Sequence, residues 1–309
     1  MEKVIAIVGP TAVGKTKVSL DLARYLDTEI ISGDSMLVYR GLDIGTAKPS
    51  LAERGGIVHE LIDIRDPGEE FSVADFKQLA AAAISRINAA GKIAVIAGGT
   101  GLYLRALLED YDLTSPPADE ALRSRLQQLA AEQGNHKLHE LLAAYDPRRA
   151  AALHPNDVRR IIRALEIVLL TNTPTEERRA PGLVYDSLVI GLTMPRDQLY
   201  ERINRRVDSM LAQGLTEEVA RLLAAGVPQD CQAMQAIGYK QMLGLAAGDC
   251  GLDEAVQAVK QATRNFAKRQ MTWYRKMPYV QWLDTTDYQD HNQLMEQIYN
   301  LVAEKFCIE

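Results

Sequence analysis

The stretch with the clearest chemistry lies near the N-terminus and is rich in glycine. It reads Gly9-Pro10-Thr11-Ala12-Val13-Gly14-Lys15-Thr16. An apolar run, residues 4–8, precedes it and a helical pattern follows it, which is the context that the G-x-x-x-x-G-K-[ST] motif requires. The glycines allow a tight turn whose backbone N–H groups converge on an anion at the helix N-terminus. Lys15 adds a positive charge and the Thr16 hydroxyl can join the shell of a Mg²⁺ ion, so the stretch predicts a di- or triphosphate site. The motif leaves open whether the phosphates belong to a nucleotide.

Two further polar residues follow predicted strands. Asp34 comes after the apolar run 29–31, and Thr100 lies in the glycine-rich turn after residues 93–97. Ligands of open parallel sheets bind outside the carboxyl ends of the strands, so both residues should face the crevice of the phosphate loop. A carboxylate there could accept a proton or hold metal-bound water. The alternatives are a helix-capping role for Asp34 and a purely structural turn at Thr100.

The composition is that of a globular protein in a reducing compartment. The chain has 309 residues, of which 47% are hydrophobic and 25% charged, and its formal net charge is −6. Its three cysteines, Cys231, Cys250 and Cys307, form no C-x-x-C pair, so we expect free thiols and a cytoplasmic location. The N-terminal apolar run is too short for a signal peptide. No run approaches the roughly eighteen apolar residues of a membrane span, so no membrane partner is expected.

The elements that must position these residues form an interrupted α/β pattern. Short strand-like segments, some apolar throughout and some mixed with polar residues, predict strands at residues 4–8, 29–31, 59–64, 93–97, 187–192 and 280–283. Ser72 predicts the start of a helix, whereas from residue 114 to residue 182 the pattern is helical throughout. We therefore predict an α/β fold with a P-loop NTPase-like parallel sheet core, residues 1–113 and 187–309, and a helical C-terminal part. Residues 114–186 would form an inserted all-helical domain.

Positive charge is concentrated on three predicted helices of this negatively charged chain. The basic residues are Arg159, Arg160 and Arg163 on the first, Arg202, Arg205 and Arg206 on the second, and Lys260, Arg264, Lys268, Arg269, Arg275 and Lys276 on the third. The third helix, residues 255–276, contains no acidic residue, and it carries Phe266 and Trp273 on its expected core-facing side. Such a stripe indicates a phosphate-rich partner, although ion-paired surface arginines are the commoner case. P-loop phosphotransferases often keep lid arginines on a helix such as the second.

Four segments together resemble the bacterial tRNA dimethylallyltransferases, also called tRNA isopentenyltransferases or the IPP transferase family. They are the phosphate loop, SGDSMLVYRGLDIGTAKP at residues 32–49, GGTGLY at 98–103 and AKRQMTW at 267–273. The resemblance covers essentially the whole chain, including HPND at residues 154–157, and the second segment is highly specific. The family transfers a dimethylallyl group from dimethylallyl diphosphate to N6 of the adenosine at tRNA position 37, beside the anticodon, and releases diphosphate.

The resemblance implies roles for the residues already singled out. Gly9, Pro10, Thr11, Ala12, Val13, Gly14, Lys15 and Thr16 would bind the diphosphate as a leaving group, with Mg²⁺ held through Thr16. Asp34 would accept the proton of N6, and Thr100 would orient the amine or the diphosphate. General-base help of this kind contributes about 10²–10⁴-fold. Catalysis is thus expected of Asp34, Thr100 and Lys15.

The resemblance also assigns tRNA contacts. They fall on Asp34, Ser35, Met36, Leu37, Thr100, Arg123, Arg159, Arg160, Ile161, Ile162, Arg163, Gln235, Gly238, Tyr239 and Lys240. The basic helix with Arg264, Lys268 and Arg269 would follow the backbone of the anticodon stem. Many relatives carry Arg or Lys after a Glu-Val pair where this chain has Val219-Ala220-Arg221, so a diphosphate contact from Arg221 stays open. A monomer is expected.

Two other functions fit parts of the sequence. A P-loop kinase of a small metabolite or nucleotide would explain the phosphate loop, but it has no use for the acid-free basic helix. An RNA-binding P-loop protein without catalysis would explain both features, but it would leave the RNA unchanged.

Overall fold

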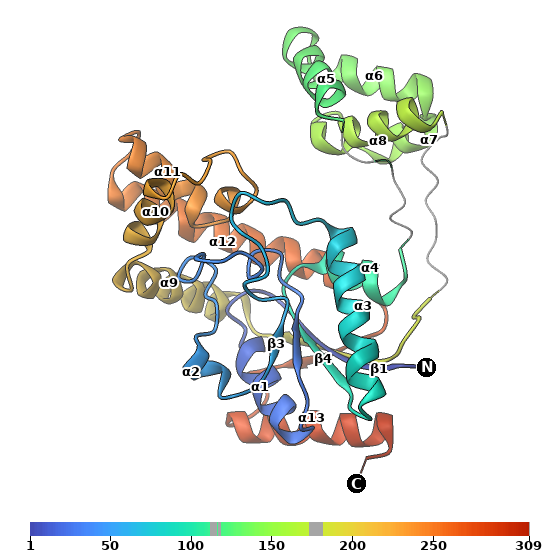
Figure 1. Ribbon diagram of the computed structural model, residues 1–309, viewed down its shortest axis with the longest axis vertical. Helices are drawn as coiled ribbons and strands as arrows, with labels where there is room; N and C mark the ends of the chain where they lie inside the picture. Colours follow the sequence, from blue (N-terminus) through green and yellow to red (C-terminus); the bar gives the residue numbers. More distant parts are fainter. Residues whose placement is uncertain (112–115, 117–118, 173–181, 309) are drawn as a thin grey trace. The chain divides into compact units, whose positions relative to one another are not determined.

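The chain folds into two compact units, which can be followed in Figure 1. The computed structural model describes residues 1–111, 116, 119–172 and 182–308. The larger unit comprises Met1–Asp110 and Pro181–Glu309, and the smaller unit comprises Tyr111–Ala180. The second boundary lies earlier than the residue 186 predicted from the sequence, because Leu183 and Tyr185 pack against the core of the larger unit.

A six-stranded sheet forms the centre of the larger unit. Its strand order is β3-β2-β4-β1-β5-β6 and every pairing is parallel. The strands are β1 (Lys3–Val8), β2 (Ile30–Ser32), β3 (His59–Glu60), β4 (Ala94–Ala97), β5 (Asp186–Thr193) and β6 (Val280–Asp284). Strands β1, β2 and β4 are almost entirely buried and read as near-continuous apolar runs, which is why the sequence revealed them. The predicted α/β fold is confirmed.

Helices cover both faces of this sheet (Figure 1). Successive side chains of a strand point to opposite faces, so β1 contributes to two separate core clusters. Val4 belongs to a cluster with residues of α3 (Val73–Ala89). Ile5 belongs to the other, with residues of α1 (Lys15–Tyr25) and α13 (His291–Phe306).

The larger unit contains further helices besides α1, α3 and α13. They are α2 (Leu51–Arg54), α4 (Gly101–Leu108), α9 (Arg196–Ala212), α10 (Leu215–Ala224), the 3₁₀ turn η1 (Ala233–Gln235), α11 (Tyr239–Ala247) and α12 (Leu252–Tyr274). The predicted basic helix is α12, and it packs against α4, α9 and α11. In the described part of the chain, no helix combines the length and the apolar character that crossing a membrane requires.

Local signals set some element ends correctly and missed others. Ser72 caps α3 as predicted, because its hydroxyl accepts from the N–H of Asp75 (3.2 Å) while the Asp75 carboxylate accepts from the N–H of Ser72 (2.8 Å). The predicted strand 59–64 is too long. Leu61 and Asp63 adopt positive φ angles of 62° and 58°, which end strand geometry after two residues.

The smaller unit is helical, as the sequence pattern predicts. It contains α5 (Glu120–Gln133), α6 (Asn135–Tyr145), α7 (Pro147–Ala152) and α8 (Val158–Thr171). Its core includes Leu126, Leu138, Leu142, Ile161 and Leu165. The apolar stripes of the helices therefore meet in a core of their own.

Candidate active site

The phosphate loop has the backbone shape of an anion-binding turn. It connects β1 to α1, and Gly9 and Gly14 adopt positive φ angles of 139° and 112°. A Cβ atom at Gly9 would lie 2.5 Å from the backbone oxygen of Leu192, so a larger residue does not fit there. Gly14 is the N-cap of α1, which directs the first N–H groups of that helix toward the loop.

Lys15 lies within this turn and close to a second cation. Its ammonium group donates to the backbone oxygens of Gly9 (3.0 Å) and Pro10 (2.8 Å). Burial, and after it the positive charge of Arg206, lowers the pKa of Lys15 to about 7, whereas Asp34 acts in the opposite direction. Burial also lowers the pKa of Arg206, again opposed by Asp34. A bound polyanion would stabilise both cations and raise both pKa values.

Asp34 and Thr100 lie on adjoining strand-end turns. The Oδ1 atom of Asp34 accepts from the N–H of Met36 (2.8 Å), while the Thr100 hydroxyl oxygen accepts from the N–H of Ser35 (3.1 Å). The Thr100 N–H in turn donates to the backbone oxygen of Gly33 (3.2 Å). The turns touch because residue 98 is glycine, since a Cβ atom there would lie 2.3 Å from the Gly33 backbone. The structure thus brings the two predicted residues to one place.

A cavity of about 420 Å³ opens beside the phosphate loop, and we call it the loop cavity. Its polar wall includes Thr11, Lys15, Thr16, Asp34, Arg206 and Gln270. Its apolar wall includes Ile30, Leu37, Pro49, Ile62 and Ala97. One cavity therefore offers positively charged residues that can bind an anion, and an apolar surface beside them.

A second cavity of about 310 Å³, the helix cavity, lies between α9, α12 and the turn Gln235–Gly238. Residues of α12 in its wall include Val259, Thr263 and Arg269. The two cavities share Thr11, Asp34, Thr46, Arg206 and Phe266. Asp34 is therefore exposed to both, and so is Phe266, which the sequence placed on the core-facing side of its helix.

Gln270 is a site residue for which the sequence predicted no role. Its side chain is 4% exposed, and its Oε1 atom accepts from the N–H of Thr11 (2.8 Å). Its Nε2 atom donates to the backbone oxygen of Gly99 (2.8 Å). The same side chain thus joins the phosphate loop to the Thr100 turn. A signal was present, because Gln270 shares the spacing of the buried residues Ala267 and Tyr274 on α12.

A family model described as IPP transferase matches residues 37–277, which is most of the chain. The chain belongs to the IPP transferase family. It is 50% identical to a tRNA dimethylallyltransferase of Geobacillus thermodenitrificans, with 100% of this chain and 98% of that protein covered. The resemblance recognised in the sequence is confirmed.

Solved structures of the IPP transferase family agree with this assignment. The full-length tRNA isopentenylpyrophosphate transferase of Bacillus halodurans is 48% identical, with a TM-score of 0.76 over 99% of this chain and 97% of that one. A eukaryotic dimethylallyltransferase captured acting on tRNA is 29% identical, with a TM-score of 0.83 over 98% of this chain and 80% of that one. The predicted P-loop NTPase-like core is thereby confirmed.

Several residues predicted to contact tRNA in this IPP transferase chain present accessible side chains. Exposed are Arg159, Arg160, Gln235, Lys240, Lys268 and Arg269. Half-buried at the cavities are Asp34, Ser35, Met36, Leu37 and Thr100. Gly238 is buried but contributes to the wall of the helix cavity. These positions are compatible with binding a large polyanion and one of its bases.

At three of the predicted contacts the structure buries the side chain. The side chain of Tyr239 is completely buried, and its hydroxyl group donates a hydrogen bond to Glu218 (2.5 Å). Ile161 and Ile162 are 0% and 5% exposed and belong to the core of the smaller unit. These three side chains are packed inside the protein, not at its surface.

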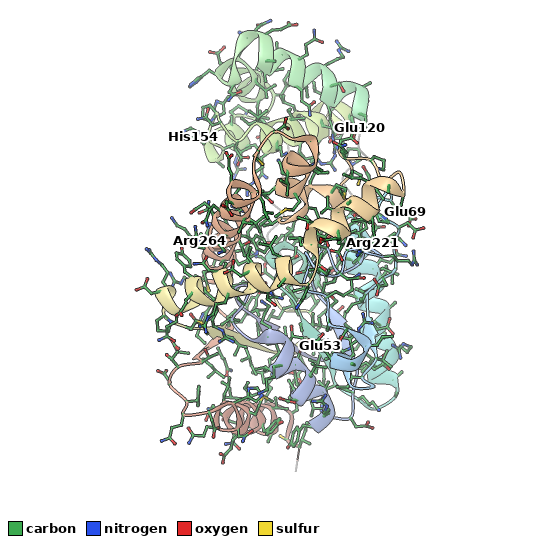
Figure 2. The ribbon with its side chains drawn as sticks, turned by 90° about the vertical axis from the view of Figure 1, so that its left-hand side faces the viewer. Glu53, Glu69, Glu120, His154, Arg221 and Arg264 are labelled. Atoms are coloured by element: carbon green, nitrogen blue, oxygen red, sulfur yellow. The ribbon has the colours of Figure 1, made fainter. Side chains whose placement is uncertain are left out.

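The other predicted arginines are held by polar partners. Glu166 is fully buried and pairs with both Arg123 (Nε to Oε1, 2.9 Å) and Arg163. In the larger unit, Arg264 of α12 (Figure 2) donates to the Oδ1 atom of Asn204 (2.7 Å). These partners fix the direction of each guanidinium group, so the predicted tRNA contacts of these arginines stay predictions.

Lys48 and Arg221 do not reach the phosphate loop. The ammonium group of Lys48 is 4% exposed and donates to the backbone oxygen of Tyr39 (2.7 Å) and to Asp43 (2.7 Å), so it anchors its own loop. Arg221 is exposed on α10 (Figure 2), and it belongs to the wall of neither the loop cavity nor the helix cavity. Arg206 of α9 belongs to the walls of both cavities. It is one of the three arginines that the sequence placed on this helix.

Proposed function

We propose that this protein transfers a dimethylallyl group from dimethylallyl diphosphate to N6 of the adenosine at position 37 of tRNA, and releases diphosphate. The observation that carries the proposal is the position of Asp34, which borders both the loop cavity and the helix cavity. One carboxylate is thus placed between a site for an anionic donor and a site that opens beside the basic helix α12. The names and substrates of the relatives support the same activity.

The loop cavity suits the donor. Backbone N–H groups at the start of α1, together with Lys15 and Arg206, would bind the diphosphate. The apolar wall around Ile30 and Ile62 would cover the five-carbon chain. As the allylic carbon–oxygen bond breaks, its electron pair goes to the diphosphate oxygen, and the two cations stabilise that charge.

The donor set also fits Mg²⁺. Thr16 contributes a hydroxyl to the loop cavity, and Mg²⁺ prefers oxygen ligands, commonly one or two from protein together with substrate phosphates. When bound, the ion would neutralise charge on the departing diphosphate. Among the described residues no cluster of three or more His, Cys, Asp or Glu forms a metal site, so the phosphates would complete its shell.

The helix cavity suits the acceptor base. Removing an adenine from its stack costs a few kcal/mol, and the cost is lower in a loop than in a duplex. In the helix cavity its N6 atom would lie beside Asp34, and Phe266 offers a ring for stacking. The new carbon–nitrogen bond forms from the N6 electron pair, and the N6 proton passes to Asp34. The Ser35 and Thr100 hydrogen bonds hold this turn in place.

The larger partner would be tRNA, met by exposed basic groups. Lys268 and Arg269 on α12, and Arg159 and Arg160 on α8, would bind backbone phosphates. Both cavities are built within one chain, so we propose a monomer. The three free cysteines fit a cytoplasmic enzyme.

The decisive experiment offers the purified protein an anticodon stem-loop RNA, dimethylallyl diphosphate and Mg²⁺. We expect the RNA mass to rise by one C₅H₈ unit and diphosphate to appear in equal amount. An RNA in which position 37 is guanosine serves as the control and should stay unmodified. An unchanged adenosine RNA, or phosphate transfer from ATP without RNA, would contradict the proposal.

A further inference from the structure

A buried carboxylate outside the two cavities joins two parts of their walls. Glu218 of α10 is 2% exposed. Its Oε2 atom accepts from the N–H groups of Asp43 (3.1 Å) and Ile44 (2.9 Å), and its Oε1 atom accepts from the N–H of Gly45 (3.1 Å). The Tyr239 hydroxyl donates to the same Oε1 atom (2.5 Å). Four neutral donors therefore converge on this group.

The two segments that meet at Glu218 both reach the helix cavity. Gly45 and the following Thr46 belong to its wall, and so does the turn Gln235–Gly238 that directly precedes Tyr239. The Tyr239 ring occupies the space beside Gly45, where a Cβ atom would lie only 2.4 Å from its Cε2 atom. The loop and the turn are thus packed in one arrangement, with Glu218 bonded to both.

The chemistry of this contact indicates that Glu218 fixes one arrangement of the loop and the turn, and that it adds little to the free energy of folding. Placing a carboxylate in a protein interior carries a desolvation penalty, which neutral donors offset only in part. An apolar side chain would avoid that penalty but would leave three backbone N–H groups unpaired. A carboxylate is the side chain that can accept from all of them, because it has two acceptor oxygens and no proton to donate.

The opposite end of the same loop has its own anchor. Lys48 holds Tyr39 and Asp43, and the adjacent residues Ala47 and Pro49 belong to the wall of the loop cavity. Glu218 acts at the other end, where the wall belongs to the helix cavity. The loop is consequently fixed at both ends, and Asp43 is shared between them, because its N–H donates to Glu218 while its carboxylate accepts from Lys48.

We infer that Glu218 is a positioning residue for the acceptor base, because it holds the Asp43–Gly45 loop against the Gln235–Tyr239 turn and so sets the shape of the helix cavity beside Asp34. This inference rests on the proposed function, in which the helix cavity receives adenine. It assigns to Glu218 and Tyr239 no contact with substrate. At the other end of the loop, Ala47 and Pro49 of the loop cavity flank the second anchor, Lys48.

The test compares Glu218→Gln and Tyr239→Phe with wild type. Gln keeps one acceptor oxygen and turns an NH₂ group toward N–H donors, so the loop loses part of its anchor. We expect the KM for the RNA acceptor to rise about tenfold, with the KM for dimethylallyl diphosphate unchanged. Tyr239→Phe keeps the buried ring and removes one donor, so it should show a smaller change in the same direction. Glu217→Gln, at an exposed position next to Glu218 on α10, is the matched control and should behave as wild type.

A binding measurement separates this inference from the proposed function. Wild type should bind a stem-loop with adenine at position 37 more tightly than one with an abasic nucleotide there, and Glu218→Gln should lose most of that preference. If Glu218→Gln does not fold, the same comparison of adenine and abasic stem-loops is made with Tyr239→Phe. An unchanged preference for adenine in the folded variants would overturn the inference, whether or not wild type transfers the prenyl group. Failure of wild type to modify RNA would overturn only the proposed function.

Discussion

The side-chain oxygen of Gln270 accepts a hydrogen bond of 2.8 Å from the backbone N–H of Thr11, which lies 259 residues earlier in the chain. The same amide donates to Gly99, in the turn that leads to Thr100. Residue 99 must be small, because a Cβ atom there would lie 2.4 Å from the Gln270 Nε2 atom. One side chain of the basic helix therefore bridges the phosphate loop and the Thr100 turn.

Replacing Gln270 by Leu should impair both folding and the use of the donor. The substitution leaves one buried N–H and one buried C=O without partners, at about 1–3 kcal/mol each. We expect kcat/KM for dimethylallyl diphosphate to fall by roughly 10–100-fold, measured as prenylated RNA formed at limiting donor. Gln257→Leu alters an exposed position of the same helix and is the control. Equal activity of the two variants would show that the bridge has no role in donor use.

Asp34→Asn should abolish most turnover while leaving RNA binding intact. The amide oxygen of Asn can still accept from the N–H of Met36, so the turn keeps its shape. It is a far weaker base than the carboxylate, and we expect a loss of about 10²–10⁴-fold in the single-turnover rate. Asp27→Asn, at a carboxylate that is 95% exposed, is the control. A near-wild-type rate for Asp34→Asn would exclude Asp34 as the general base.

The sequence predicted those features that depend on neighbours along the chain. The phosphate loop, the apolar strands and the Ser72 cap are local patterns, and each has its own chemical signature. Gln270 and Glu218 were missed because their partners, Thr11 and the Asp43–Gly45 loop, are distant in sequence. A polar residue at a buried helical position is informative only when its partner is known.

The two isoleucines show the opposite case. The helical pattern of the sequence already placed Ile161 and Ile162 on an apolar face, and the structure buries both in the smaller unit. The family resemblance nevertheless assigned them to tRNA binding, together with the arginines beside them. Periodicity was the better guide to these side chains, because a resemblance marks a segment whereas periodicity distinguishes its faces.

Donor binding should weaken as the pH rises through about 7. Burial lowers the pKa of Lys15 to about 7 from an ordinary 10.5, so the free enzyme loses this positive charge near neutrality. Diphosphate favours the charged form, and its binding above pH 7 must therefore take up a proton. We expect kcat/KM for the donor to decline above about pH 7 and calorimetry in buffers of different ionisation enthalpy to detect proton uptake. In Lys15→Arg, whose guanidinium stays charged, the uptake should vanish even if activity is low.

The titration of Lys15 should also affect the free energy of unfolding. Donor binding weakens as the pH rises, whereas the stability of the folded protein should increase. Because the unfolded chain keeps Lys15 protonated up to about pH 10.5, it binds more protons than the folded protein between pH 7 and that value. The Lys15 contribution to the free energy of unfolding therefore increases with pH across this window. Lys15→Met removes the titrating group, so the difference in the free energy of unfolding between wild type and this variant should vary with pH. A constant difference from about pH 7 to about pH 9 would contradict the lowered pKa.

Neutralising one exposed cation of α12 should reduce the salt dependence of RNA binding. Each phosphate neutralised by the protein releases counterions, and the slope of log K against log salt is about −0.9 per contact on a duplex stem. Lys268→Gln removes one exposed charge without disturbing the core, so the slope should become shallower by about one contact and the loss of affinity should be similar for different stem sequences. Lys92→Gln is the control, because Lys92 precedes the amino end of β4, away from the strand ends that form the site. If the two variants show identical slopes, the basic face of α12 does not bind the RNA backbone.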